Sequence, residues 1–206
     1  MRFASIGSGS RGNGTLVQAG DNLLLVDCGF ALKETIARLT RLGIEPQQLS
    51  AVLVTHEHGD HCSGVRVLAN RYQLPVYMTA GTARSKVLAD VAHAVIIDSH
   101  APFAVGEIAV QPVAVPHDAA EPVQFVFSWQ NRCLGLLTDI GAVTPFVKQH
   151  YSACDALLLE SNHCLDMLAR SDYPPSLKLR VSGRFGHLSN SQATSLLEVV
   201  DTARLQ

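Results

Sequence analysis

A histidine-rich stretch, THEHGDH at Thr55–His61, carries the densest chemistry in this chain. It holds three of the nine histidines and directly follows an apolar run, AVLV. Side chains two residues apart in extended backbone point the same way, so His56 and His58 are predicted to share one metal ion. Asp60 and His61 fall where the chain turns into a helix, which re-aims them toward a second ion. We therefore expect a two-metal site here and not a histidine-rich surface loop.

Further groups of the same kind follow other apolar runs. His117 comes after VQPVAV, and Asp139 comes after CLGLLT. His163 and His187 lie later, in the segments DALLLESNH and GHLSN. Polar side chains after several separate strands indicate one common rim, and a carboxylate such as Asp139 can bridge two cations. His117 and Asp139 are therefore predicted to be metal ligands.

The hydrophobic pattern predicts the elements that must position these groups. Short apolar runs bounded by turn residues indicate strands, and apolar residues at three- and four-residue spacing indicate helices. Strands are predicted at 2–6, 15–19, 23–27, 51–55 and 75–79, with further β-rich runs from 94 to 138. Helices are predicted at 32–39, 65–72, 82–91 and 144–151, and a last one is capped by Ser189 or Asn190 and buries Ala193, Leu196, Leu197 and Val200. Two series of strands with interleaved helices predict a layered α/β protein.

Length and composition exclude several classes of protein. The 206 residues, 47% hydrophobic and 17% charged, predict a single folded domain over 1–206 and not a disordered chain. The apolar runs are too short to cross a membrane, and the N-terminus lacks the apolar core of a secretory signal. Five scattered cysteines predict no disulfide framework, which favours a cytoplasmic location. The net charge of −2 means that any nucleic acid must be bound by local groups.

HxHxDH, followed by a later histidine and a later aspartate, resembles the metallo-β-lactamase superfamily. The blocks SGSRGNGTLV, LLLVDCG, PHDAAEPVQFVFS, LTDIG, ESNHCLDML and YPPSLKLRVSGRFGHLSN are similar to the YycJ/WalJ (VicX) group of bacterial proteins and cover most of the chain. The resemblance implies an αββα four-layer sandwich and two divalent ions, zinc or manganese. It also implies hydrolysis of phosphodiester bonds, as a 5′→3′ DNA exonuclease, by a hydroxide that the two ions generate.

The resemblance also assigns metal ligands. One ion would be held by His56, His58 and His117, the other by Asp60 and His61, with Asp139 bridging both.

Two positions depart from the pattern of the group. Cys164 stands where an acidic residue is expected after Asn162 and His163. The superfamily also needs one more metal histidine, and His187 is either that ligand or a neighbour of the ligands. In the second case the true ligand lies past Gln206, the C-terminal part of the domain is missing from this chain, and the second metal site is incomplete.

Catalytic and substrate-binding roles follow from these positions. Asp60 is expected to orient the attacking water, and His187, where it is not a ligand, to bind the phosphate or protonate the leaving oxygen. A basic stretch just before His187 would hold backbone phosphates, and its members are Arg170, Lys178, Arg180 and Arg184. Each of these residues alone is equally typical of a solvated surface. The predicted substrate contacts are Arg180, Arg184, Asn162, His163, Ser8 and Asn13.

Other motifs near the site have simpler interpretations. Gly7–Gly12 matches the GxGxxG pattern of dinucleotide sites, but the sequence after it is β-like where such a site needs a helix. Asp27 is predicted to orient the histidine loop. Cys28 and Cys62 are predicted to be small buried hydrophobic residues and not catalytic thiols.

Two other functions fit the same sequence. The fold also supports hydrolysis of a thioester, a lactone or a β-lactam, and a chain with an incomplete metal centre would be an inactive scaffold or fragment. GHLSN and the basic stretch favour phosphate chemistry.

Overall fold

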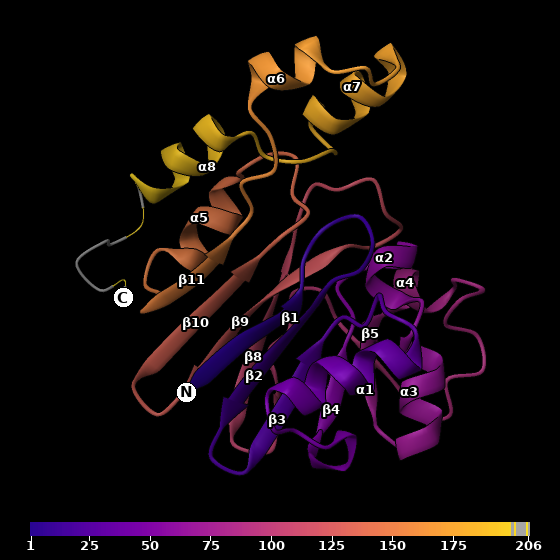
Figure 1. The fold of residues 1–206 in the computed structure, drawn as a ribbon. Helices are drawn as coiled ribbons and strands as arrows, with labels where there is room; N and C mark the ends of the chain where they lie inside the picture. The colour runs from indigo at the N-terminus through magenta and orange to yellow at the C-terminus, as the bar shows by residue number, and fades with distance from the viewer. Residues whose placement is uncertain (199, 201–204, 206) are drawn as a thin grey trace. The chain divides into compact units, whose positions relative to one another are not determined.

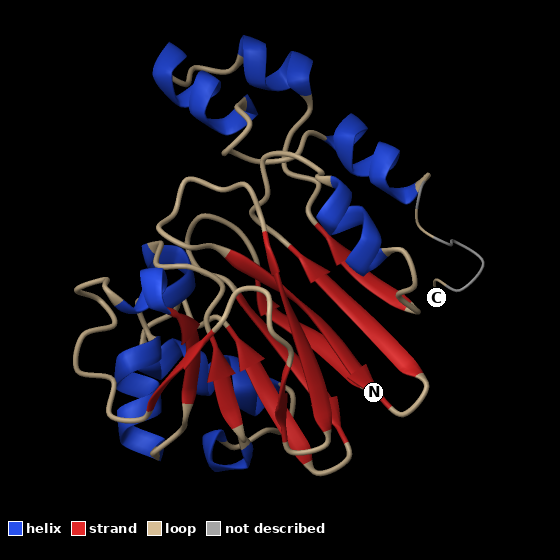
Figure 2. Ribbon diagram, turned by 180° about the vertical axis from the view of Figure 1, so that it is seen from behind, coloured by secondary structure: helices blue, strands red, loops and turns tan. Residues whose placement is uncertain are grey.

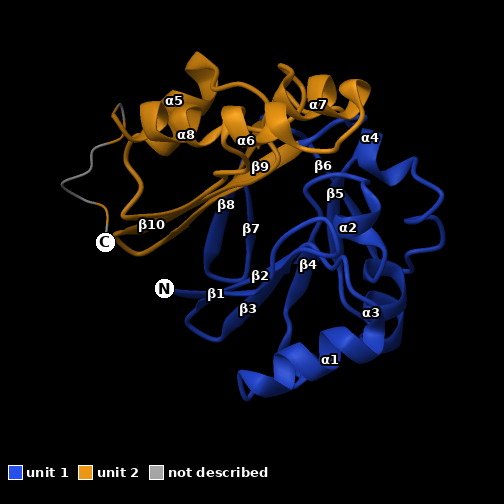
Figure 3. Ribbon diagram, turned by 45° about the horizontal axis from the view of Figure 1, so that its top comes forward, with its two compact units in different colours: residues 1–110, 119–122 blue, residues 111–118, 123–206 orange. Residues whose placement is uncertain are grey.

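The computed structural model of the protein describes residues 1–198, 200 and 205. Its contacts divide the chain into two compact units (Figure 3). Unit 1 comprises residues 1–110 and 119–122, and unit 2 comprises residues 111–118 and 123–206. None of the described helices is long and apolar enough to cross a lipid bilayer.

Unit 1 is built on a six-stranded sheet whose strands follow one another in chain order (Figure 1). The first three strands pair antiparallel, and the following ones continue the sheet in parallel. The strands are β1 (Arg2–Gly7), β2 (Gly14–Ala19), β3 (Asn22–Val26), β4 (Ala51–Leu53), β5 (Val76–Thr79) and β6 (Ala94–Ile97). Parallel β3 and β4 end at the same edge, so the residues that follow them meet there.

The helices of unit 1 bury one face of this sheet. Leu39 of α1 (Leu32–Arg41) and Leu68 of α3 (Val65–Tyr72) pack in one core with Val52 and other strand residues. The short helices are η1 (Pro46–Gln48), α2 (Gly59–Cys62) and α4 (Ala80–Ala83). The predicted helices at 32–39 and 65–72 are thereby confirmed.

The second sheet has five strands in the order β11-β10-β9-β8-β7. These are β7 (Phe103–Val105), β8 (Ile108–Ala114), β9 (Val123–Trp129), β10 (Arg132–Leu137) and β11 (Ala156–Leu159), and the unit boundary falls within β8. In unit 2, α5 (Pro145–Tyr151) and α8 (Asn190–Leu197) pack on this sheet through Val147, Tyr151 and Leu196. The remaining helices are α6 (Leu165–Arg170) and α7 (Pro175–Ser182).

The helix predicted over 82–91 is wrong. Thr79 caps α4 by accepting the N–H of Thr82, and the helix ends after Ala83, with turns over residues 84–90. Only Leu88 is fully buried among the apolar residues of this segment; Ala83 and Val91 are partly buried against the core of unit 1, and Val87 is exposed. A short helix without a continuous buried face gains too little from packing to extend.

The last predicted helix is present, with one error in its buried face. Ser189, and not Asn190, is its N-cap, and it forms a reciprocal capping box with Gln192. Ala193, Leu196 and the residue Val200 beyond the helix are buried as predicted. Leu197 is exposed, because it lies on the side of α8 away from the core of unit 2.

Candidate metal centre

The histidine loop of unit 1 is held by a buried carboxylate at the end of β3. Asp27 accepts hydrogen bonds from the backbone N–H and the hydroxyl of Thr55, both at 2.8 Å. Its Oδ2 also lies 2.8 Å from Nδ1 of His61. An ionised carboxylate can only accept, so His61 donates from Nδ1 and keeps its lone pair on Nε2. Asp27 therefore orients this loop, as the sequence predicts.

The same hydroxyl orients the first histidine of the motif. Thr55 Oγ1 gives its proton to Asp27 and lies 2.9 Å from Nδ1 of His56, so it accepts from that nitrogen. The lone pair of His56 is then on Nε2, which lies 3.1 Å from Nδ1 of His58. Two nitrogen ligands about 2.0–2.1 Å from a tetrahedral zinc ion are about 3.3 Å apart. The spacing of these two imidazoles therefore fits a shared divalent ion.

The glycine-rich loop after β1 contributes one side chain to this site, that of Asn13. The side-chain nitrogen Nδ2 of Asn13 lies 3.3 Å from Oδ2 of Asp60 and 3.0 Å from Nε2 of His61. Backbone bonds hold the loop there, including one of 2.7 Å from the N–H of Asn13 to the carbonyl of Asp60. A Cβ on Gly29 would lie 1.8 Å from that same carbonyl oxygen, which explains the glycine in VDCG. Ser8 is exposed, and no contact brings it to these residues within the described part of the chain.

In unit 2, His117 follows β8 and is buried. Its Nδ1 lies 3.1 Å from the carbonyl oxygen of Gly186, which can only accept, so Nε2 carries the lone pair. Burial lowers the pKa of His117 below 6.5, and the opposing charge of Asp139 does not reverse this. His117 is thus a neutral imidazole near pH 7, the form that binds a metal ion.

A second group in unit 2 joins Asp139, Glu160 and His187, whose ligand atoms all lie within 4.8 Å of one another. Nδ1 of His187 lies 2.6 Å from Oε1 of Glu160 and 3.5 Å from Oδ1 of Asp139. Burial alone lowers the pKa of His187, but the hydrogen bond to Glu160 and the charges of Glu160 and Asp139 outweigh it. The pKa of His187 therefore lies above 6.5, and the imidazole can carry a proton at neutral pH.

Glu160 is a candidate site residue that the sequence did not predict. It follows β11 directly, and its Oε2 accepts the backbone N–H groups of Ile140 and Leu188 at 3.1 and 3.0 Å. The rule that predicted Asp139, a carboxylate placed directly after an apolar strand, applies to Glu160 equally. In DALLLES, Glu160 comes directly after the apolar residues and so carries that signal.

The predicted substrate residues His163 and Asn162 lie beside the GHLSN segment. Asn162 donates its backbone N–H to the carbonyl of Leu188, and the carbonyl of His163 accepts from Asn190. Both ring nitrogens of His163 are buried and have no hydrogen-bond partner among the described residues. Burial and the nearby charge of His187 lower the pKa of His163, so its imidazole is neutral.

The two predicted arginines differ in their surroundings. Nε of Arg180 donates a hydrogen bond of 2.5 Å to Oδ2 of Asp118, which is the residue after His117. Arg184 is exposed beside Gly186 and His187 in the chain. Cys164 forms the N-cap position of α6 and offers no side-chain hydrogen bond there.

The cysteines near the histidine loop behave as predicted. Burial raises the pKa of Cys28 to about 11 and that of Cys62 to about 12, so both remain thiols at neutral pH. The GxGxxG match is followed by strand β2 and not by a helix, which excludes a dinucleotide site of that type.

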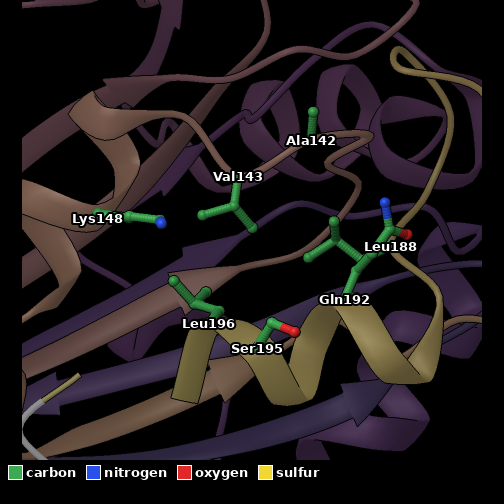
Figure 4. Close-up of a pocket in the computed structure, with 7 residues that line it drawn as sticks. All are labelled: Ala142, Val143, Lys148, Leu188, Gln192, Ser195 and Leu196. Carbon is green, nitrogen blue, oxygen red and sulfur yellow. The ribbon is translucent and has the colours of Figure 1, made fainter. Parts of the chain in front are cut away.

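Unit 2 also contains a pocket of about 320 Å³ between α8 and the segment before α5 (Figure 4). Lys148 is the only charged residue in its lining. The lining includes no predicted metal ligand or substrate residue. It is formed by Ala142, Val143, Lys148, Leu188, Gln192, Ser195 and Leu196.

Comparisons with known proteins agree with this picture. A sequence model described as the Beta-lactamase superfamily domain matches residues 22–206. Exodeoxyribonuclease YycJ of Bacillus anthracis is 36% identical over 210 residues, which cover 98% of this chain and 78% of that protein. Exodeoxyribonuclease WalJ of Streptococcus pneumoniae serotype 2 is 32% identical over 203 residues, covering 96% of this chain and 76% of that protein. The metallo-β-lactamase fold protein YhfI of Bacillus subtilis shares the fold, with a TM-score of 0.72 at 20% identity over 96% of this chain and 81% of that chain.

Proposed function

The chain belongs to the metallo-β-lactamase superfamily and resembles its YycJ/WalJ group along almost its whole length, and from this we propose that it is a metal-dependent DNA exonuclease. The observation that carries the proposal is the 36% identity, over 98% of the chain, to a protein named an exodeoxyribonuclease. Removal of nucleotides in the 5′→3′ direction is part of the proposal. The αββα class predicted from the sequence agrees with the two sheets and their helices.

We propose that the protein uses two divalent ions, zinc or manganese. In the proposed arrangement His56, His58 and His117 hold one ion, Asp60 and His61 hold the other, and Asp139 bridges them. Support comes from each unit by itself. Hydrogen bonds hold Nδ1 of His56, His61 and His117, so that Nε2 is the nitrogen available to an ion in all three. Nitrogen and oxygen donors of this kind suit both metals.

When bound, the ions would lower the pKa of the attacking water and neutralise charge on the phosphate. The protein's own groups then have two tasks. Asp60, whose carboxylate is steadied by Asn13, is proposed to orient the attacking water by accepting its hydrogen bond. Asn13 limits the directions that this carboxylate can take, which favours one position of the water.

His187 is proposed to be the general acid and not the last metal ligand. Its Nδ1–H is bound by Glu160, and its raised pKa favours a second proton on Nε2 at neutral pH. A proton on Nε2 suits donation to the leaving 3′ oxygen of the cleaved bond and opposes coordination of a cation. Four residues are proposed to contact the substrate. Asn162 and His163 are hydrogen-bonded through their backbone to the GHLSN segment, and Arg180 and Arg184 precede His187 closely in the chain.

A cytoplasmic location is also proposed. The five cysteines all lie in the described residues and form no disulfide bond, although Sγ of Cys133 and Sγ of Cys154 are 3.6 Å apart. The support for this location is that five cysteines, odd in number and scattered along the chain, do not make the disulfide framework of a secreted domain.

The proposed activity is tested with labelled substrates. Single- and double-stranded DNA and RNA, each labelled at the 5′ or the 3′ end, are incubated with the protein and either manganese or zinc. Release of labelled mononucleotides from the 5′ end of DNA is expected, with His58→Ala and Asp60→Asn inactive. Nitrocefin and a thioester serve as comparison substrates. Faster hydrolysis of either one than of DNA would overturn the assignment.

A further inference from the structure

Residues 165–186 of unit 2, which we call the helical arm, comprise α6, α7 and the turns that join them to the GHLSN segment. In Figures 1 and 2 these two helices project beyond the end of β11, past α5 and α8. No residue of α7 is buried, and α6 buries only Leu168. The arm therefore has almost no core of its own.

The arm exposes large apolar side chains in place of a core. The exposed fractions are 73% for Met167, 54% for Tyr173, 74% for Leu179 and 61% for Phe185, and Leu165 is also exposed. Scattered single hydrophobic residues on a surface are ordinary, but five within twenty-one consecutive residues indicate a surface that contacts something. An eight-residue helix with no buried side chain, such as α7, gains little stability alone, which also indicates that this surface contacts a partner.

The charges of the arm indicate the chemistry of the partner. Its cations are Arg170, Lys178, Arg180 and Arg184, against the two carboxylates Asp166 and Asp172. The chain as a whole carries a net charge of −2, so this segment is positive where the rest is negative. Arg180 is already paired with Asp118, and Lys178 donates from Nζ to the carbonyl of Ala169 at 2.7 Å. Arg170 and Arg184 are both exposed.

We propose that the helical arm binds the unpaired strand of the DNA substrate, with bases stacked on Tyr173 and Phe185 and backbone phosphates bound by Arg170, Lys178 and Arg184. Exposed aromatic rings between cations are the combination with which proteins hold single strands. In a duplex the faces of the bases are covered by their neighbours, so stacking on these two rings requires unpaired bases. Phe185 stands two residues before His187, so a base stacked there belongs to a nucleotide near the bond that is cut.

This inference rests on the proposed nuclease function, because that function supplies the single strand. A protein partner or a second copy of the chain would also cover apolar residues. Contact between the arms of two copies would bring like charges together, because each arm carries an excess of cations. Association of the arm with an acidic surface of a protein or of a second copy is therefore an outcome that the test below must distinguish.

The test measures binding without hydrolysis. The probe is a fluorescein-labelled phosphorothioate oligothymidylate of twenty nucleotides, which resists cleavage, and the readout is fluorescence anisotropy. Tyr173→Ala and Phe185→Ala are each expected to weaken binding by at least about fivefold, and the double variant by at least about twentyfold. Tyr173→Phe keeps the ring and should bind as the unmodified protein does.

The role of the cations is tested by the salt dependence of binding. Arg170→Gln and Lys178→Gln should each lower the slope of log Kd against log salt concentration by about 0.7. Phe3→Ala and Arg41→Gln, an exposed aromatic residue and an exposed cation of unit 1, are the matched controls and should change neither affinity nor slope.

Three results would overturn the inference. The first is unchanged affinity of the double variant for the single strand. The second is an equal loss of affinity for single- and double-stranded probes, which would exclude stacking. The third is an unmodified protein that is dimeric by analytical ultracentrifugation and a double variant that is monomeric with normal DNA binding. Hydrolysis of labelled DNA is measured separately, so failure of the nuclease proposal and failure of the arm are distinguishable.

Discussion

Glu160 holds the imidazole of His187 through a 2.6 Å contact between Oε1 and Nδ1, while its Oε2 accepts the backbone N–H groups of Ile140 and Leu188. Both oxygens of this carboxylate are thus engaged, and its position is set by the backbone that follows β10 and by the GHLSN segment. The negative charge stays beside His187 and raises the pKa of the imidazole. The pair forms an acid whose proton is available near neutral pH.

Replacing His187 by alanine removes the proposed acid. We expect kcat on DNA to fall by about 10²–10⁴-fold, with the metal content of the protein unchanged. Steady-state kinetics and elemental analysis by mass spectrometry measure the two quantities. Loss of one bound ion per chain would instead show that His187 is a ligand.

Glu160→Gln keeps the size of the side chain and removes its charge. If the protonated form of His187 is the acid, as proposed, activity falls as pH rises through the pKa of His187, which lies above 6.5. The variant lowers that pKa, and the alkaline side of the pH–rate profile should move to lower pH. Glu198→Gln, at an exposed carboxylate of the same unit, is the control and should leave the profile in place.

The same pair makes stability depend on pH. Because the pKa of His187 is raised in the folded protein, its contribution to stability is complete below pH 6.5 and is lost as pH rises through the folded value. Urea unfolding of the metal-free protein from pH 5.5 upward should show this loss. Glu160→Gln should reduce stability most at the acidic end of the series, and a uniform loss at every pH would contradict the linkage.

Asp27→Asn tests the orientation of the histidine loop. Asp27 has a φ of 60°, a left-handed conformation that asparagine also accepts, so the backbone need not change. Asparagine has one acceptor oxygen and no charge, so it cannot replace both carboxylate oxygens that accept from Thr55 and His61. We expect metal affinity to fall by about 10–100-fold, measured by competition with a chromogenic chelator. Asp21→Asn, at an exposed turn of the same unit, should bind metal normally.

Gly29→Ala probes the approach of two loops in unit 1. The added Cβ would lie 1.8 Å from the carbonyl oxygen of Asp60 and 2.9 Å from the backbone nitrogen of Asn13. Backbone must move to admit it, and we expect a loss of about 1–3 kcal/mol in the free energy of unfolding, together with weaker metal binding. Thermal and urea unfolding measure the loss, with the exposed Ser10→Ala as control. A variant as stable as the parent would show that this approach is not required.

The active-site motif and most of the elements around it were readable from residue type and spacing. HxHxDH behind an apolar run predicts ligands after a strand, and β4 ends at Leu53, just before that motif. The sequence also limits the cap of the last helix to Ser189 or Asn190, because a side-chain oxygen there satisfies a backbone N–H that the helix leaves without a partner. The structure selects Ser189. These features are local, so a few neighbouring residues suffice to specify them.

The errors have a common physical origin. The pattern over 82–91 has helical spacing, but the helix ends at Ala83 and turns follow it, with Leu88 buried and Val87 exposed. The helical spacing of Ala193, Leu196 and Val200 predicts that Leu197 is buried with them, yet Leu197 is exposed. Burial depends on what the rest of the chain brings alongside, and periodicity alone carries no such information.

The hydrophobic pattern of the chain thus predicted the layered α/β class of fold. The spacing of His56 and His58 predicted a loop that can hold a metal ion, because donors two residues apart in extended backbone point the same way. Folding in three dimensions settled which carboxylate governs His187, since Glu160 and His187 are 27 residues apart in the chain. It also left the helical arm without a core. Both the contact between Glu160 and His187 and the exposure of the helical arm depend on packing between residues that are distant in the sequence.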